Sequence, residues 1–106
     1  MIGRVVKGRG EIGIYKITNL ENGKIYIGQT KQSFKERLRT HVKRGVRAEP
    51  GTSNKLYNAM WEEGVENFTF EILSECPAAD LNKKEKEFIE FYHADTWGYN
   101  SNKGVG

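Results

Sequence analysis

One carboxylate in this sequence stands where a core side chain is expected. Spacing of 100° per residue predicts a helix from Ala79 to about His93, and Leu81 and Ile89 belong to its apolar stripe. Glu85 lies inside that stripe, four residues from each of them. Burying a carboxylate costs on the order of several kcal/mol unless the group is paired or holds a metal ion. The sequence therefore predicts a cation beside Glu85.

Two kinds of cation would stabilise Glu85. The commoner outcome for a lone buried glutamate is an ion pair with a lysine or an arginine. The alternative is a divalent metal ion. A single carboxylate suits one Mg²⁺ (or Mn²⁺), which keeps several waters and takes substrate phosphates as further ligands. A zinc site built from several cysteines is excluded, because the chain contains one cysteine, Cys76. The residues alone leave the ion pair and the metal site open.

Arg37 and His41 form a second candidate pair. They are four residues apart in a predicted helix, so they lie on adjacent parts of one face, with His41 inside the apolar stripe and Arg37 at its edge. An arginine matches phosphate geometry with two nitrogens, and a histidine donates or accepts a proton near neutral pH. Each residue also has an ordinary interpretation, as a surface arginine and as a core histidine hydrogen-bonded to backbone.

Two tyrosines occupy similar settings on either side of a turn. Tyr15 ends the run GIY at residues 13–15, Tyr26 opens the run YIG at residues 26–28, and Asn22-Gly23 between them is typical of a hairpin turn. Packing in a strand is the usual role of such a tyrosine. A catalytic pair is the alternative. A phenol with a pKa of about 10 is a poor base, so a neighbouring charge would have to lower that pKa, or the tyrosine would relay a proton to His41.

The elements that position these residues predict one small α+β domain. At 106 residues and 37% apolar, the chain is long enough for a modest core. Alternation predicts a three-stranded, mostly antiparallel sheet, flanked by three or more helices. Ser33 and Ser53 are expected to cap the first two helices, which Gly45 and Gly64 end. The expected strands are residues 12–18, 24–28 and 67–73.

Basic residues gather at the predicted first helix. The net charge is only +3, but residues 31–47 hold a single acid, Glu36. Such a cluster suits a polyanion by neutralising its phosphates, although a solvated helix face explains the charge equally well. The residues expected to contact the substrate backbone are Lys24, Lys31, Lys35, Arg39, Lys43 and Arg44.

Taken in order, these residues resemble the GIY-YIG nuclease family. The two triplets are present at residues 13–15 and 26–28, and they are followed by Arg37 in SFKERLRTH, Glu85 in LNKKEKEFIEFY and Asn100 in GYN. Either triplet alone is a weak signal. Five elements in this order and at family-like spacing are a specific one.

The resemblance implies the GIY-YIG fold and hydrolysis of phosphodiester bonds with one divalent ion, which Glu85 would hold. It implies that Arg37 binds the scissile phosphate and offsets its developing charge. Tyr15 and Tyr26 would converge near that phosphate, one of them activating or orienting the attacking water. His41 matches a position that assists in several members of the family. Asn100 is implied to pack against the site or to hydrogen-bond to it.

Within the family the sequence looks most like the N-terminal catalytic domain of phage and intron homing endonucleases. The partner would be double-stranded DNA, cut by a monomer or a transient dimer. The alternatives are a small stand-alone repair-type nuclease, an inactive nucleic-acid-binding module of the same fold, and a small interaction protein that binds acidic partners. Glu85 argues against the inactive module, because an unpaired carboxylate facing phosphates would weaken binding.

The predicted organisation is a flexible N-terminal arm at residues 1–11, the catalytic domain at residues 12–100, and an exit tail at residues 101–106 that could open a linker. No apolar run approaches a membrane span, and no signal peptide is visible. The single cysteine fits a reducing compartment. We therefore expect an intracellular, nucleoid-associated protein in the cytoplasm of a bacterial or phage-infected host, without a membrane partner.

Overall fold

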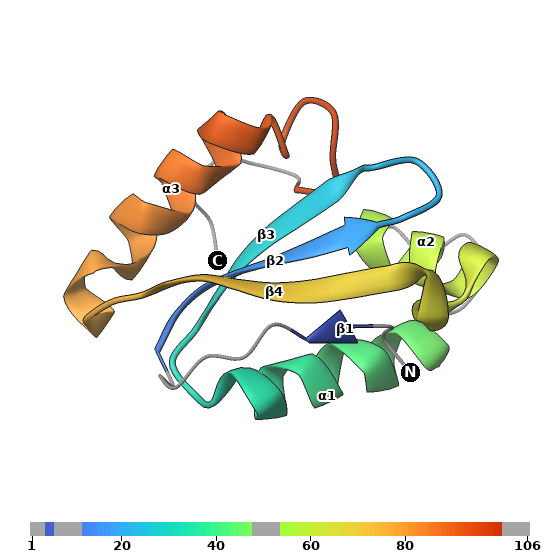
Figure 1. The fold of residues 1–106 in the computed structure, drawn as a ribbon, viewed down its shortest axis with the longest axis horizontal. Helices are drawn as coiled ribbons and strands as arrows, with labels where there is room; N and C mark the ends of the chain where they lie inside the picture. Colours follow the sequence, from blue (N-terminus) through green and yellow to red (C-terminus); the bar gives the residue numbers. More distant parts are fainter. Residues whose placement is uncertain (1–3, 6–11, 48–53, 101–106) are drawn as a thin grey trace.

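The computed structural model describes residues 4–5, 12–47 and 54–100, which form a sheet with helices on both faces (Figure 1). The strand order is β1-β4-β2-β3. The central strand β2 pairs antiparallel with β3 and with β4, and β1 runs parallel to β4 at one edge. The strands are β1 (Arg4–Val5), β2 (Gly13–Asn19), β3 (Ile25–Thr30) and β4 (Phe68–Glu75).

Three helices cover the two faces of the sheet. They are α1 (Phe34–Val46), α2 (Lys55–Glu63) and α3 (Leu81–Tyr92), and short 3-10 turns at Val65–Asn67 and Ala78–Asp80 lead into β4 and α3. α1 and α2 lie over one face and α3 over the other (Figure 1). The predicted α+β architecture, with its antiparallel strands and flanking helices, is confirmed; the two-residue strand β1 adds to the three strands expected.

The β2–β3 hairpin folds as its turn residues predict. Gly23 adopts a φ of +76°, a conformation that glycine takes without strain, and its N–H donates to the Asn19 carbonyl oxygen at 2.7 Å. The resulting register places Tyr15 directly opposite Gly28. The last residue of the first triplet therefore faces the last residue of the second.

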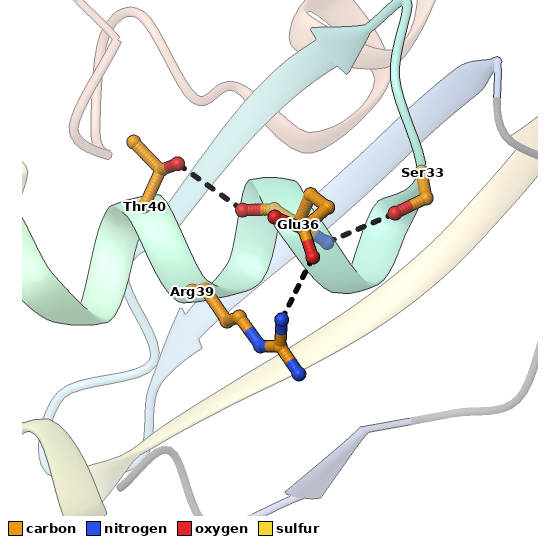
Figure 2. Close-up of polar contacts among 4 residues, drawn as sticks. All are labelled: Ser33, Glu36, Arg39 and Thr40. Atoms are coloured by element: carbon orange, nitrogen blue, oxygen red, sulfur yellow. Dashed lines mark hydrogen bonds and ion pairs between the residues drawn. The ribbon is translucent and has the colours of Figure 1, made fainter.

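Helix α1 begins at the predicted cap. Ser33 Oγ accepts the Glu36 N–H at 3.1 Å, as Figure 2 shows. The Glu36 carboxylate pairs with Arg39 at 2.8 Å, one turn further along, and Thr40 Oγ1 donates to the Glu36 carbonyl oxygen at 3.1 Å. The helix continues one residue beyond Gly45.

Helix α2 begins one residue later than the sequence predicted. Asn54 is the N-cap, and its Oδ1 accepts the Tyr57 N–H at 3.0 Å. The expected cap, Ser53, lies outside the described residues. Asparagine and serine are comparable N-cap residues, so two neighbouring candidates could not be ranked from the sequence. Gly64 ends the helix as expected.

The sheet buries a separate apolar cluster on each face. Alternation directs Tyr15 and Ile17 toward α1 and α2, and Ile14 and Ile27 toward α3. A register shift between Ile14 and Tyr15 interrupts the pairing of β2 with β4 at this point. Because β3 is an edge strand, residues from α1 on one face and from α3 on the other can meet at this edge of the sheet.

Most of the predicted arm and the whole predicted tail lie outside the described residues. Of residues 1–11, the structure describes Arg4–Val5, which form β1. Among the described segments, no helix is both long enough and apolar enough to cross a membrane.

Candidate active site

An open pocket of about 620 Å³ lies where β3 ends. Arg37 enters it from α1 and Asn82 from α3, so the pocket joins the helices on opposite faces of the sheet. The rest of its wall is the end of β3 and the segment that follows. Those residues are Gln29, Thr30, Lys31 and Gln32.

Glu85 is completely buried directly behind this wall. The Gln29 side-chain amide donates to Glu85 Oε1 at 3.0 Å and to Asn82 Oδ1 at 2.9 Å, so Gln29 lies between the pocket and the carboxylate. Glu85 Oε2 is buried and has no hydrogen-bond partner among the residues that the structure describes. Burial raises the pKa of the Glu85 carboxyl, and the hydrogen bond from Gln29 offsets part of that rise.

The ion-pair interpretation of Glu85 is not supported in the described part of the chain. There the ion pairs join Lys16 to Glu71 and Arg39 to Glu36, and neither involves Glu85. Lys16 is held by Glu71 at 3.4 Å and lies 4.8 Å from the centre of the Tyr92 ring. The described residues also contain no group of three or more histidine, cysteine, aspartate or glutamate side chains suited to a metal ion.

The donor set therefore fits one particular kind of metal site. A single buried carboxylate with one orphaned oxygen offers a hard divalent ion one protein ligand, and water and substrate phosphates would supply the rest. Zinc would require more protein ligands than the described residues bring together here.

Tyr15 forms the inner wall of the site and has no exposed surface. Its ring stacks on Phe70, with centroids 4.8 Å apart, and its hydroxyl accepts a hydrogen bond from Arg37 Nε at 3.1 Å. The same hydroxyl lies 2.5 Å from His41 Nε2. A methyl group on Gly28 would overlap the Tyr15 hydroxyl, so the glycine of YIG leaves the space that the tyrosine of GIY fills.

Tyr26 lies on the same face of the sheet as Tyr15, and it is partly exposed. Its ring centroid is 6.3 Å from that of Tyr15 and 5.7 Å from that of His41. Burial raises the pKa of both phenols. Of the two alternatives for the tyrosines, a pKa lowered by a neighbouring charge is not supported for Tyr15, because the lowering effect of Arg37 is smaller than the effect of burial.

His41 connects two tyrosines rather than the backbone. It is 1% exposed; its Nε2 faces Tyr15, and its Nδ1 lies 2.9 Å from the Tyr57 hydroxyl on α2. The interpretation of His41 as a core histidine is therefore right about its burial. It is wrong about the hydrogen-bond partners, which are tyrosine side chains and not the backbone. Burial, with the positive charges of Arg37 and Arg44, lowers the pKa of His41 to about 3.

This lowered pKa predicts an acid-sensitive fold. In the unfolded chain His41 takes up a proton below pH ~6.5, whereas in the folded chain it stays neutral until pH approaches its pKa of about 3. The free energy of unfolding therefore falls as pH drops through this window. Between pH ~7 and pH ~5 the expected loss is about 2 kcal/mol, measured by urea unfolding followed by circular dichroism.

The variant His41→Gln should lose this pH dependence, since glutamine does not titrate. The exposed histidine His93 provides the matched control, and His93→Gln should keep the wild-type loss. An equal loss in His41→Gln and in the wild type would show that another group causes the acid sensitivity.

Arg37 is half-buried and placed to serve two partners. Its Nε is used by Tyr15, but neither of its terminal amino groups is hydrogen-bonded to a described residue. Because Arg37 lines the pocket, these two groups are available to an anion there.

Asn100 is nearly buried and contacts the backbone of the YIG strand. Its Oδ1 accepts the Ile27 N–H and its Nδ2 donates to the Ile27 carbonyl oxygen, both at 2.8 Å. The neighbouring Tyr99 N–H donates to the Ile25 carbonyl oxygen at 2.9 Å. Residues 99–100 therefore cover the outer edge of β3, and Asn100 acts on the site by holding this strand.

The predicted substrate-binding residues are spread over the surface. Lys31 lines the pocket beside Arg37. Lys24 lies by the hairpin turn, at the other end of β3, in a separate hollow of about 450 Å³. The structure therefore brings Lys31 to the site and leaves Lys24 away from it.

The remaining basic residues belong to α1. Arg39, Lys43 and Arg44 line a third hollow along this helix, and Arg39 is already paired with Glu36. Lys35 is exposed on the same helix. These side chains lie along α1 and do not line the pocket itself.

Sequence reasoning missed three residues that contact the predicted site residues. Gln29 and Asn82 lie between the pocket and Glu85, and Tyr57 binds His41. Asn82 precedes Glu85 by three residues, so helical spacing could have placed it nearby. No comparable signal marks Tyr57, because its partner lies on another helix.

Comparisons with known proteins agree with this fold. The family model described as "GIY-YIG catalytic domain" matches residues 11–100. The structure is similar to a mutant of the catalytic domain of intron endonuclease I-TevI, with a TM-score of 0.77, 27% identity, and 89% of this chain and 96% of that chain covered. It is also similar to the catalytic domain of homing endonuclease I-TevI, with a TM-score of 0.76, 28% identity, and coverages of 87% and 99%. A search of curated proteins found no match.

The family model spans both triplets, Arg37, Glu85 and Asn100, which the fold gathers around the edge strand β3. The chain therefore belongs to the GIY-YIG family, and residues 11–100 form its catalytic domain.

Proposed function

We propose that this GIY-YIG domain is a metal-dependent endonuclease of the homing type that hydrolyses phosphodiester bonds in double-stranded DNA. One observation carries the proposal: within the described residues, a buried carboxylate with an orphaned oxygen, Glu85, lies behind a pocket into which Arg37 presents two amino groups that no described residue binds. The likeness to the catalytic domain of a homing endonuclease supports the choice of substrate.

Glu85 would hold one Mg²⁺ or Mn²⁺ through Oε2. When bound, such an ion supplies positive charge that stabilises the phosphorane-like transition state and the leaving oxygen. Gln29 orients the carboxylate through Oε1, which leaves Oε2 for the ion.

Arg37 would bind the scissile phosphate with its two terminal amino groups. Its Nε remains on Tyr15, so the guanidinium is fixed in direction before substrate arrives. The partly exposed Tyr26 would contact the attacking water, and the buried Tyr15 behind it would orient Tyr26 and Arg37.

The target would be double-stranded DNA, contacted along α1 by the exposed Lys35, Arg39, Lys43 and Arg44. One site of this kind cuts one strand, so a monomer would nick DNA, and a transient dimer or two successive nicks would give a double-strand break. The intracellular location stays a prediction from the single cysteine.

The test of this proposal is cleavage of supercoiled plasmid with Mg²⁺ by the wild type and by Arg37→Ala. Removing a charged group aimed at the phosphate is expected to lower the cleavage rate about 10²–10³-fold. The matched control is Arg47→Ala, which removes the same charge from an exposed position at the end of α1 and should cut at nearly the wild-type rate. EDTA should abolish cleavage by all three proteins.

Cleavage that persists in EDTA would contradict the metal dependence. Equal rates for Arg37→Ala and Arg47→Ala would contradict the site. A wild type that binds DNA in a salt-sensitive manner and never cuts it would favour the inactive binding module instead.

A further inference from the structure

A chain of hydrogen bonds leads from the inner wall of the site to the surface at α2. The Tyr15 hydroxyl lies 2.5 Å from His41 Nε2, and the Tyr57 hydroxyl lies 2.9 Å from His41 Nδ1. At the other end, the Tyr26 ring lies beside the Tyr15 ring, with centroids 6.3 Å apart. Tyr15 and His41 are buried, whereas Tyr26 and Tyr57 are both partly exposed. The hydrogen bonds therefore lead from the buried Tyr15 through His41 to the partly exposed Tyr57, and Tyr26 lies on the other side of Tyr15.

The direction of the hydrogen bonds follows from Arg37, which can only donate. Its Nε–H donates to the Tyr15 oxygen, and among the described residues His41 Nε2 is the acceptor that lies within hydrogen-bond distance of this buried hydroxyl. The Tyr15 proton is then directed to His41 Nε2. A neutral imidazole that accepts at Nε2 carries its proton on Nδ1, and that proton is donated to the Tyr57 oxygen.

We propose that Tyr57 is a positioning residue of the nuclease reaction, because its hydroxyl keeps the proton of His41 on Nδ1 and provides the exit through which a proton leaves the site. The inference rests on the proposed function. It concerns a residue of α2 that lies behind His41 and outside the pocket.

The relay moves one proton through four groups. As the water oxygen bonds to phosphorus and the bond to the leaving oxygen breaks, the water proton passes to Tyr26 and the Tyr26 proton to Tyr15. The Tyr15 proton passes to His41 Nε2, the Nδ1 proton to Tyr57, and the Tyr57 proton to solvent. The leaving oxygen takes a proton from bulk water. Each group gives one proton and receives one, so all four end neutral.

A neutral relay suits the environment of these groups. Burial and the charges of Arg37 and Arg44 on α1 lower the pKa of His41, and burial raises the pKa of Tyr15. An imidazolium or a phenolate would therefore be unfavourable at this place. Tyr15, Tyr26 and Tyr57 are the groups that face His41 from β2, β3 and α2.

Tyr57→Phe keeps the ring and removes the hydroxyl, which leaves a buried Nδ1–H without an acceptor. The His41 proton is then expected to move to Nε2, where it blocks transfer from Tyr15. We expect kcat for plasmid cleavage to fall tenfold or more, on the order of a general acid–base contribution, while KM stays unchanged. Nitrogen-15 NMR of the imidazole should show His41 protonated at Nδ1 in the wild type and at Nε2 in the variant.

Tyr99→Phe is the matched control. It removes another core tyrosine hydroxyl, which accepts from Asn19 Nδ2 at 2.9 Å, and it should leave both kcat and the His41 tautomer as in the wild type. A wild-type His41 protonated at Nε2, or a Tyr57→Phe protein with wild-type kcat, would overturn the inference. If the wild type itself does not cut, the proposed function fails, and the NMR spectra still decide the hydrogen-bond assignment.

Discussion

Replacing Glu85 with glutamine is expected to abolish DNA cleavage and at the same time to raise the free energy of unfolding. Glutamine has nearly the same shape, but it lacks the charge that would hold a divalent ion. The cleavage rate should fall at least about 10³-fold, measured on supercoiled plasmid with Mg²⁺. Stability should increase because a neutral amide costs less to bury than a carboxylate with one orphaned oxygen.

The expected gain in stability is about 1–3 kcal/mol at neutral pH, read as an increase in the urea midpoint. The matched control is Glu87→Gln, since Glu87 is exposed on the same helix. It should change neither cleavage nor stability. A Glu85→Gln protein that is less stable than the wild type would show that the carboxylate supports the fold, and it would contradict the assignment of Glu85 as a metal ligand held at a cost.

The second large effect is expected from Gly28→Ala. The added methyl group would overlap the Tyr15 hydroxyl, so the tyrosine must move away from Arg37 and His41. Overpacking of this kind costs about 1–3 kcal/mol of stability. Because the same displacement breaks the contacts that orient Arg37, the cleavage rate should fall about 10²-fold or more.

The control variant Gly23→Ala separates the loss of stability from the loss of cleavage rate. Gly23 lies in the hairpin turn at a φ of +76°, so alanine there destabilises the fold by about 1 kcal/mol without touching the site. Its thermal midpoint should drop while cleavage below that midpoint stays near the wild-type rate. If Gly23→Ala and Gly28→Ala lose activity in the same proportion to their stability, the space left by Gly28 has no particular role in the site.

Local signals predicted the parts of the fold that depend on neighbouring residues. The Asn22-Gly23 turn fixed the hairpin, and Ser33 marked the start of α1, because turns and caps are satisfied within a few residues. The burial of Glu85 was predicted for a different reason: this charged residue lies within the apolar stripe of its own helix. A residue that breaks a local rule is often a functional one.

The features that were not predicted depend on contacts between distant segments. β1 pairs with β4, which lies more than half of the chain away in sequence. Because β1 is only two residues long, it shows no alternation that could have predicted a strand. Tyr57 has the spacing of an ordinary helix residue, and its role appears only when α2 packs beside α1. Asn100 was expected near the site. The sequence could not show that its side-chain amide makes the two backbone hydrogen bonds to Ile27 that a neighbouring strand would otherwise make.

That last contact has a consequence for synthesis of the protein on the ribosome. Ile27 is translated early. Its outward N–H and carbonyl groups, however, are hydrogen-bonded only once the side chain of Asn100, the final described residue, has been made. A nascent chain that stops short of this residue holds both triplets and Glu85 but leaves the edge of β3 open. The outer edge of β3 is therefore completed only when the last residue of the matched domain has left the ribosome.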